Sequence, residues 1–331
     1  MRVLSGVQCT GKLHLGNYLG AMKQHIELQR EHECFYFIAN YHSLTTVQDA
    51  SSLRDYTSDV ALDYLAMGLD PKKACLFRQS DIPEVTELTW ILSTVTNKGL
   101  LERATSYKDK VAQGITPSMG LFNYPILMAA DILIYRSDLV PVGKDQVQHI
   151  EMAQDMAGYF NRAFGQEVLK RPEPKLNEAM VVPGIDGRKM SKSYGNTINL
   201  FDHSEVTREH IMSVKTDSTP LAAPKDPDTC NVFAMYRLLA EPDEVKTLED
   251  RYRAGGMGYQ EAKKLLADVV ERLLGPARER REKLAADKGY VEDVLRTSAC
   301  RARAVAQKVM ADVREACGLV TKSLKVERLK G

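Results

Sequence analysis

The sequence lacks most of the features that mark proteins outside the ordinary globular class. Its 331 residues include only 13 prolines and 21 glycines, too few for a fibrous or low-complexity chain. The longest apolar stretch, residues 122–135, is broken by an asparagine, a proline and an aspartate and falls short of the roughly 20 residues that cross a bilayer. The N-terminus has no long apolar segment of a secretory signal. We therefore expect a folded, cytoplasmic protein without membrane contact.

Closely spaced cysteines are absent as well. The nearest two of the six, Cys300 and Cys317, are 17 positions apart, which excludes a Cys-x-x-Cys metal or redox pair. Neither sign of charge dominates, since 45 Lys and Arg stand against 44 Asp and Glu, but residues 271–331 hold 15 basic residues against 9 acidic ones. A basic end of this kind fits either a polyanionic partner or a solvated helical face.

What is present is an alternation of apolar strands and amphipathic helices. Strand patterns occur at residues 2–5, 34–39, 74–77 and 139–142, and helical patterns at 15–29, 53–67 and after Gly143. This order predicts an α/β fold with a Rossmann-like parallel sheet and helices on both faces. Residues 84–135 read as a helical insertion with surplus apolar surface, typical of an oligomer interface. From residue 204 onward only helical patterns remain, so the C-terminal third is expected to be all-helical.

A glycine-rich loop follows the first expected strand and precedes the first helix. Residues 6–20 read GVQCTGKLHLGNYLG. Glycines let backbone approach a phosphate, the N–H groups at a helix start favour anions, and His14 adds a side-chain donor. The spacing matches neither the dinucleotide nor the P-loop fingerprint. Alone, this loop fits a phosphate site or a structural turn.

A second loop, Lys189-Met190-Ser191-Lys192-Ser193, is flanked by Gly187 and Gly195. Two lysines separated by small hydroxyl residues on a glycine-hinged loop can fold over a polyphosphate and neutralise it. The alternative is a solvated basic turn.

Together the two loops resemble the paired signatures of the class I aminoacyl-tRNA synthetases, His-x-Gly-His-like and Lys-Met-Ser-Lys-Ser, with Asn17 in the second signature position. The segments 124–135, 140–149, 160–161 and 216–218 narrow the resemblance to the bacterial tryptophanyl-tRNA synthetases, and it runs with gaps from about residue 1 to 320.

The resemblance implies an enzyme that activates L-tryptophan with ATP to the adenylate and pyrophosphate, then transfers tryptophan to the 3′-terminal ribose of tRNA(Trp). It implies Mg²⁺ held mainly by the ATP phosphates and no metal-ligating side chains. The iron–sulfur cluster known in some members needs closely spaced cysteines, which this sequence lacks. It also implies a homodimer through the insertion at 84–135. The expected domains are a catalytic domain at 1–200, a helical anticodon-binding domain at 201–290, and a C-terminal helix and tail at 291–331.

The resemblance assigns site residues position by position. Catalysis would use Lys110, Lys189 and Lys192. ATP binding would use Gln8, His14, Gly16, Asn17, Gly143, Asp145, Met190, Ser191 and Ser193. The tryptophan pocket would use Leu4, His42, Met128, Asp131, Val140, Val142 and Gln146.

Some of these positions depart from the family or have simpler interpretations. Cys9 replaces a usual proline, His14 a frequent threonine, and Lys144 an acidic residue. Lys110 could be an ordinary surface lysine, His42 a satisfied core histidine and Met128 a packing residue.

Asp131 is the candidate specificity residue. The indole N–H is a hydrogen-bond donor with no acceptor capacity, so an otherwise apolar tryptophan pocket needs one hydrogen-bond acceptor. The alternative is a solvent-facing helix cap. Two rival functions share the scaffold: a tyrosyl-tRNA synthetase, and a non-catalytic RNA-binding relative. Arg278, Arg280 and Arg281 are candidate tRNA phosphate contacts, although they alternate with glutamates as on a solvated helix.

Overall fold

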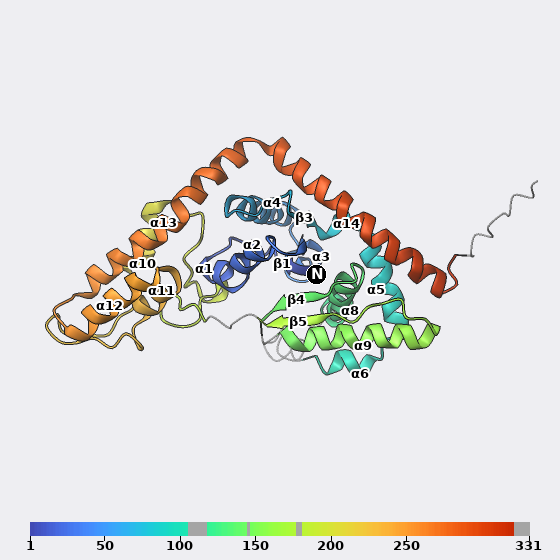
Figure 1. Ribbon diagram of the computed structural model, residues 1–331, viewed down its shortest axis with the longest axis horizontal. Coiled ribbons are helices and arrows are strands. Elements are labelled where there is room, and N and C mark those ends of the chain that lie inside the picture. The colour runs from blue at the N-terminus through green and yellow to red at the C-terminus, as the bar shows by residue number, and fades with distance from the viewer. Residues whose placement is uncertain (105–117, 144–145, 177–180, 321–331) are drawn as a thin grey trace, which may run out of the picture.

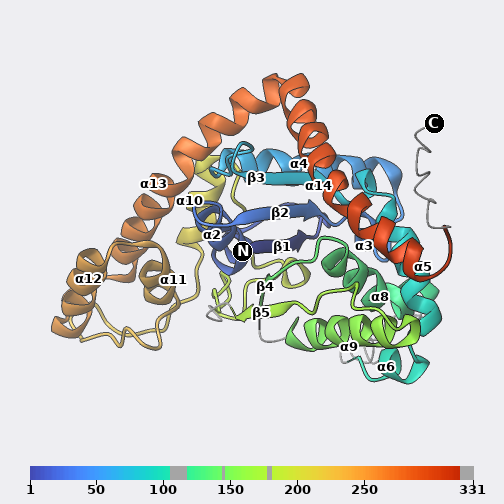
Figure 2. The ribbon, with the colours of Figure 1, turned by 45° about the vertical axis from the view of Figure 1, so that its right-hand side comes forward.

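The computed structural model describes residues 1–104, 118–143, 146–176 and 181–320. Within them, one five-stranded parallel sheet has the order β3-β2-β1-β4-β5, which can be followed from top to bottom in Figure 2. The strands are β1 (Arg2–Val7), β2 (Glu33–Ile38), β3 (Ala74–Arg78), β4 (Leu139–Val142) and β5 (Glu173–Leu176). The predicted α/β class with a parallel sheet is confirmed.

Both faces of the sheet are covered because its central strands are apolar on both sides. In β2, Tyr36 and Ile38 lie in one buried cluster while the alternate residues Phe35 and Phe37 lie in the other. This alternation is the period-two geometry of a strand, and it explains why β2 reads as a nearly continuous apolar run.

Helices fill the intervals between strands and are the regular structure of the described part of the C-terminal third, as the sequence predicts. The N-terminal helices are α1 (Leu15–Asn17), which continues through a π-helical turn (Tyr18–Met22) into α2 (Lys23–Leu28), then α3 (Asn40–Ser43) and α4 (Ala50–Ala66). The insertion holds α5 (Glu84–Val95), α6 (Lys98–Glu102) and α8 (Met119–Leu133), and α9 (Val147–Phe164) follows β4. The C-terminal helices are α10 (Ser204–Met212), α11 (Asn231–Leu239), α12 (Pro242–Ala254), α13 (Tyr259–Ala286) and α14 (Lys288–Ala316). Short 3-10 turns lie at Gln79–Asp81 and Lys192–Tyr194. Among the described residues, no helix is long and apolar enough to cross a membrane.

The edge strand β5 is missing from the sequence prediction. Residues 171–175 read as a Pro-rich polar connection, but Glu173–Leu176 pairs in parallel with β4, with Pro174 opposite Val140. None of its four residues is buried, so the strand carries no apolar pattern. An edge strand is also where a proline is tolerated, because one side of the strand needs no ladder donors.

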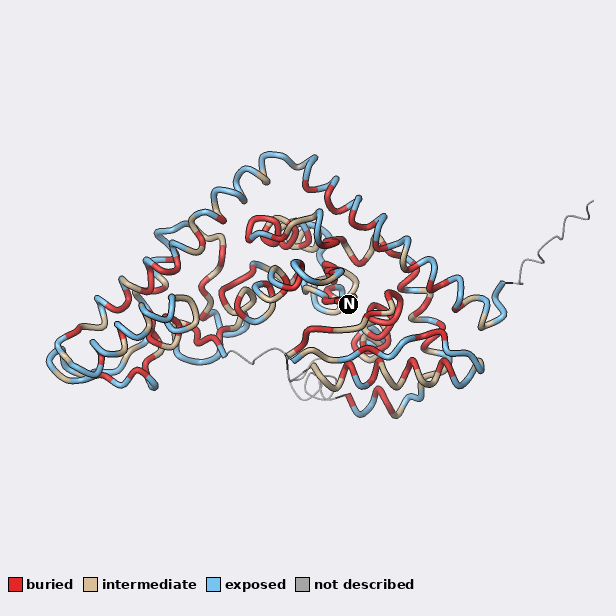
Figure 3. The backbone as a smooth tube through the Cα atoms, viewed as in Figure 1, coloured by how far each residue is buried: buried red, intermediate tan, exposed pale blue. Residues whose placement is uncertain are grey.

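The two longest helices straddle the sheet. In Figure 1, α13 rises from the small helices α10–α12 to an apex above α4, and α14 descends on the other side. α14 packs on β3 and α5 through Val309 and Val313, which belong to the second core cluster, the one that contains Phe35 and Phe37. Figure 3 shows the consequence, with buried positions on the inner side of both helices and exposed ones outside.

The three arginines considered as tRNA contacts have partners inside the chain. Arg278 donates to Thr207 Oγ1 (2.9 Å), Arg280 to the carbonyl of Ala66 (2.7 Å), and Arg281 to Asp63 Oδ1 (2.7 Å). The alternation with glutamates at this part of α13 therefore reflects a helix that packs on α10 and α4, and charge reversal here would disturb that packing.

Candidate functional site

The first loop leaves β1 and is held by its own short-range bonds. His14 caps α1, and its N–H donates to Asn17 Oδ1 (3.1 Å), which satisfies a donor at the helix start. A Cβ on Gly16 would lie 2.9 Å from the ring of His14. Glycine at this position therefore allows the imidazole to lie against the backbone of the first helical turn.

The second loop is organised by Asn196, which the sequence prediction did not include. Its Oδ1 accepts from the N–H of Ser191 (2.8 Å), and its Nδ2 donates to Asp186 Oδ1 (2.7 Å) and to the carbonyl of Lys189 (3.2 Å). Asn196 is only 1% exposed. A buried amide with bonds on both of its ends fixes the loop from which Lys189 and Lys192 project. The sequence signal for this role was the position of Asn196, which closely follows the loop Lys189–Ser193.

Backbone pairing ties the two loops together. The N–H of Leu15 donates to the carbonyl of Ile198 (2.9 Å), and the N–H of Leu200 donates to the carbonyl of Leu13 (3.0 Å). In addition, Lys192 Nζ donates to the carbonyl of Gly11 (2.8 Å). Segments more than 180 positions apart thus form one structural unit.

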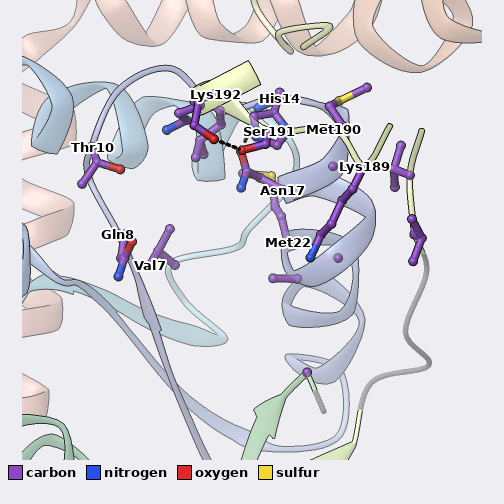
Figure 4. Close-up of a pocket in the computed structure, with 18 of the residues that line it drawn as sticks. Val7, Gln8, Thr10, His14, Asn17, Met22, Lys189, Met190, Ser191 and Lys192 are labelled. Carbon is purple, nitrogen blue, oxygen red and sulfur yellow. Dashed lines mark hydrogen bonds between the residues drawn. The ribbon is translucent and has the colours of Figure 1, made fainter. Parts of the chain in front are cut away.

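The two loops enclose a cavity of about 910 Å³. Every described residue of the predicted ATP set lines it, as do both described lysines of the catalytic set: Gln8, His14, Gly16, Asn17, Gly143, Lys189, Met190, Ser191, Lys192 and Ser193. Figure 4 shows Gln8 and Thr10 on one side, and Asn17, Met190 and Lys189 on the other. Lys110 and Asp145 lie outside the described residues, as does the family departure Lys144.

The electrostatics of this cavity favour an anionic occupant. Desolvation, with the nearby charge of Lys192, lowers the pKa of His14 to about 4, so the imidazole is neutral at pH 7. Desolvation also lowers the pKa of Lys192, opposed mainly by the carboxylate of Asp63. His14 Nδ1 is buried without a hydrogen-bond partner in the described chain. A neutral imidazole still has one N–H to offer, and an added negative group would relieve the desolvated lysine.

The described residues that line this cavity include none of the predicted tryptophan set, whose acidic member is Asp131. Asp131 is 2% exposed, so the alternative of a solvent-facing cap is wrong. His42 Nε2 donates to its Oδ2 (2.8 Å), and the amide nitrogen of Gln79 donates to Oδ1 (2.9 Å) and Oδ2 (2.8 Å). Burial raises the pKa of Asp131, and the bonds from His42 and Gln79 oppose that rise. The histidine is therefore satisfied by the carboxylate itself.

Most other members of the tryptophan set belong to the core or pack against it. Leu4, Val140 and Val142 belong to the second core cluster, and Met128 packs against it. Gln146 is half-buried at the N-cap of α9. His42 lines a separate hollow of about 380 Å³ between α3, α5 and α8.

Gln79 is the second residue absent from the prediction. It directly follows β3, at the carboxyl end of a parallel strand, where ligands bind in open α/β sheets. That position was a usable signal, but glutamine carries no charge and fits no motif. Among the described residues, no group of three or more His, Cys, Asp or Glu side chains is placed to hold a metal ion.

Comparisons with known proteins agree with this geometry. A family model described as class I tRNA synthetases (W and Y) matches residues 1–275. The chain is 54% identical over 319 residues to a tryptophan–tRNA ligase from Rhodopirellula baltica, covering 96% of this chain and 100% of that protein. It is 52% identical over 320 residues to one from Fusobacterium nucleatum, covering 96% and 98%. The crystal structure of tryptophanyl-tRNA synthetase from Campylobacter jejuni complexed with ADP and tryptophan aligns with a TM-score of 0.90 at 46% identity, covering 96% of this chain and 100% of that one.

Proposed function

The chain belongs to the class I aminoacyl-tRNA synthetases of the tryptophan and tyrosine group, and from this membership we propose that it joins L-tryptophan to tRNA(Trp) at the expense of ATP. The observation that carries the proposal is that both signature loops line one and the same cavity. The 54% identity to a tryptophan–tRNA ligase favours tryptophan over tyrosine.

In the first step, a carboxylate oxygen of tryptophan attacks the α-phosphorus of ATP, and the bond to the pyrophosphate oxygen breaks. Negative charge develops on the departing pyrophosphate, so positioned cations lower the barrier without forming a covalent bond. Lys189 and Lys192 line the cavity, which supports that role for them, and we propose Lys110 as a third cation. Lys192 would exchange the carbonyl of Gly11 for a phosphate oxygen.

The other residues of the cavity hold the nucleotide in place. The neutral imidazole of His14 donates its one N–H to a phosphate oxygen, and Gly16 leaves room for that ring. Mg²⁺ bound mainly by the ATP phosphates would neutralise part of their charge. We assign Gln8, Asn17, Gly143, Asp145, Met190, Ser191 and Ser193 to the same nucleotide site.

Tryptophan binds with its indole N–H directed to Asp131. Apolar walls come from Leu4, Val140 and Val142, and Met128 can shift at low cost to admit the ring because methionine is unbranched and flexible. In the second step, a terminal ribose hydroxyl of the tRNA attacks the carbonyl carbon of the adenylate, and AMP leaves.

We assign residues 1–200 to catalysis, 201–290 to the anticodon and 291–331 to a C-terminal helix and tail, in a cytoplasmic homodimer. Apolar surface on the insertion supports the dimer, because Trp90 is 72% and Met119 70% exposed. A hollow of about 410 Å³ between α5 and α8 is lined by Trp90, Phe122 and Ile126, among other residues. Sedimentation velocity tests this: Trp90→Glu should shift a dimer to monomer, and a monomeric wild type would contradict it.

One assay tests the activity. Pyrophosphate exchange measured with tryptophan and with tyrosine should be strong with the first and weak with the second. Greater exchange with tyrosine would support the tyrosyl alternative. Absence of exchange with either amino acid, in a chain that binds tRNA, would support the non-catalytic alternative.

A further inference from the structure

The side chain of Gln79 connects three elements at the base of the proposed tryptophan pocket. It begins the 3-10 turn after β3 and is 1% exposed. Its Nε2 reaches both carboxylate oxygens of Asp131 on α8, while its Oε1 accepts from the N–H of Tyr41 on α3 (3.0 Å). The amide orientation follows from these contacts, because a flipped amide would place its oxygen against the carboxylate and leave two nitrogens face to face at Tyr41.

These bonds determine what the carboxylate can still accept. An ionised carboxylate has about four acceptor positions, two on each oxygen. Among the described residues, Oδ2 receives Gln79 and His42, whereas Oδ1 receives Gln79 alone. The open acceptor position is therefore on Oδ1, and its direction depends on the plane in which Gln79 holds the carboxyl group. Without the amide this plane is weakly fixed, since the terminal torsion of aspartate is broad.

We propose that Gln79 is a positioning residue that sets tryptophan specificity by fixing the carboxylate of Asp131 with one acceptor directed at the indole N–H. This inference rests on the proposed function, in which Asp131 receives that N–H. Gln79 itself bonds to Asp131 and to the backbone N–H groups of Tyr41 and His42, so its effect on the substrate is indirect.

The test compares Gln79→Met with Gln29→Met. Gln29 is also a buried glutamine with both ends bonded, donating to the carbonyl of Gly68 (3.2 Å) and accepting from the N–H of Asp70 (2.8 Å). It does not line the ATP cavity. Losing either amide should lower thermal stability by a similar amount, so the control removes the purely structural effect.

The readout is pyrophosphate exchange with tryptophan and with an analogue whose ring nitrogen is replaced by sulfur. Gln79→Met should raise the KM for tryptophan by roughly 10-fold to 100-fold, the scale of a lost hydrogen bond to a charged group. Its preference for tryptophan over the analogue should fall by a similar factor, because the analogue has no N–H to lose. The KM for ATP and kcat should stay near the wild-type values, and Gln29→Met should keep the wild-type preference.

Gln79→Glu provides a second variant that keeps the acceptor for Tyr41 and opposes a carboxyl group to Asp131. It should also lose the preference, and it replaces Gln79→Met if that variant does not fold. Wild-type preference in a folded Gln79 variant would overturn the inference while leaving tryptophan activation in place. A wild-type enzyme that does not exchange with tryptophan would instead contradict the proposed function.

Discussion

Two aspartates buried to nearly the same extent have different partners in this molecule. Asp131 is 2% exposed and Asp63 is 3% exposed. Asp131 receives an imidazole and an amide, while Asp63 on α4 receives the guanidinium of Arg281 from α13, which also donates to Asp59 (2.5 Å). Burial raises the pKa of both, to about 7 for Asp63, where Arg281 opposes the rise.

The difference separates a structural carboxylate from one available to a ligand. Arg281 brings a permanent charge and a fixed fork of donors, so the ion pair joins α4 to α13 and compensates the buried charge of Asp63 without substrate. The donors of Asp131 orient it but leave one acceptor position open. The burial of a carboxylate therefore shows only that placing its charge there costs free energy, whereas its hydrogen-bond partners indicate its role.

The largest expected effect would come from removing the open acceptor. Sites built around a substrate donor reject analogues lacking it by up to roughly 10⁴-fold, because the acceptor is left unpaired. Wild type should show a strong preference for tryptophan over the sulfur analogue in pyrophosphate exchange, and Asp131→Ala should lose most of it. Asp63→Ala is the matched control and should keep the preference. Equal ratios in wild type and Asp131→Ala would place the indole acceptor elsewhere and end the distinction between the two aspartates.

The second prediction concerns the stability of the protein in place of its preference for tryptophan. Arg281→Ala leaves the carboxylate of Asp63 buried without its cation, which should lower the free energy of unfolding by about 3 kcal/mol. Urea unfolding measures this loss, and the preference for tryptophan should not change. Since well-packed apolar pairs can replace buried ion pairs, Arg281→Met with Asp63→Leu should recover much of the stability. A wild-type free energy of unfolding for Arg281→Ala would show that the ion pair does not stabilise the fold.

The third prediction concerns Lys192, whose charge lies within the field of Asp63 but acts at the ATP cavity. Losing one preorganised donor to the leaving group typically costs on the order of 100-fold or more in rate. Lys192→Ala should slow adenylate formation by about that factor while tryptophan binding stays nearly intact. Rapid-quench measurement of the adenylate burst checks this, with Lys12→Ala, on an exposed ion pair with Asp202, as control. A burst equal to wild type would remove Lys192 from the chemistry.

The sequence predicts those parts of the molecule whose signal is local. Apolar runs identified β1 to β4, and the two loop motifs, through their resemblance to the class I signatures, identified most of the predicted ATP set, because loop chemistry depends on a few adjacent side chains. Asp131 could be found because a carboxylate within an apolar helix is costly and so needs a reason.

The missing parts depend on contacts between distant segments. β5 is exposed and proline-bearing, so only its pairing with β4 makes it a strand. Arg281 seemed to belong to a solvated face because its partner Asp63 is 218 positions away. Gln79 and Asn196 are uncharged amides, and what they do becomes visible only when both ends of each amide have partners.

The smallest expected effect extends the comparison to His25, a buried titratable group without a charged partner. Its ring stacks on Tyr36 (4.5 Å between centroids), its Nδ1 bonds the hydroxyl of Tyr64 (3.0 Å), and burial lowers its pKa to about 4. The unfolded chain takes up this proton near pH 6.5, so stability is full above that pH and is lost as pH falls toward 4. Between pH 7 and pH 5 the loss due to His25 should be about 2 kcal/mol. His14 adds a similar trend, which His25→Gln retains, so urea unfolding of wild type and His25→Gln at both pH values isolates the effect. Equal losses of unfolding free energy in the two proteins would mean that His25 is protonated inside the folded protein at pH 5. Burial without a charged partner would then not suppress ionisation here.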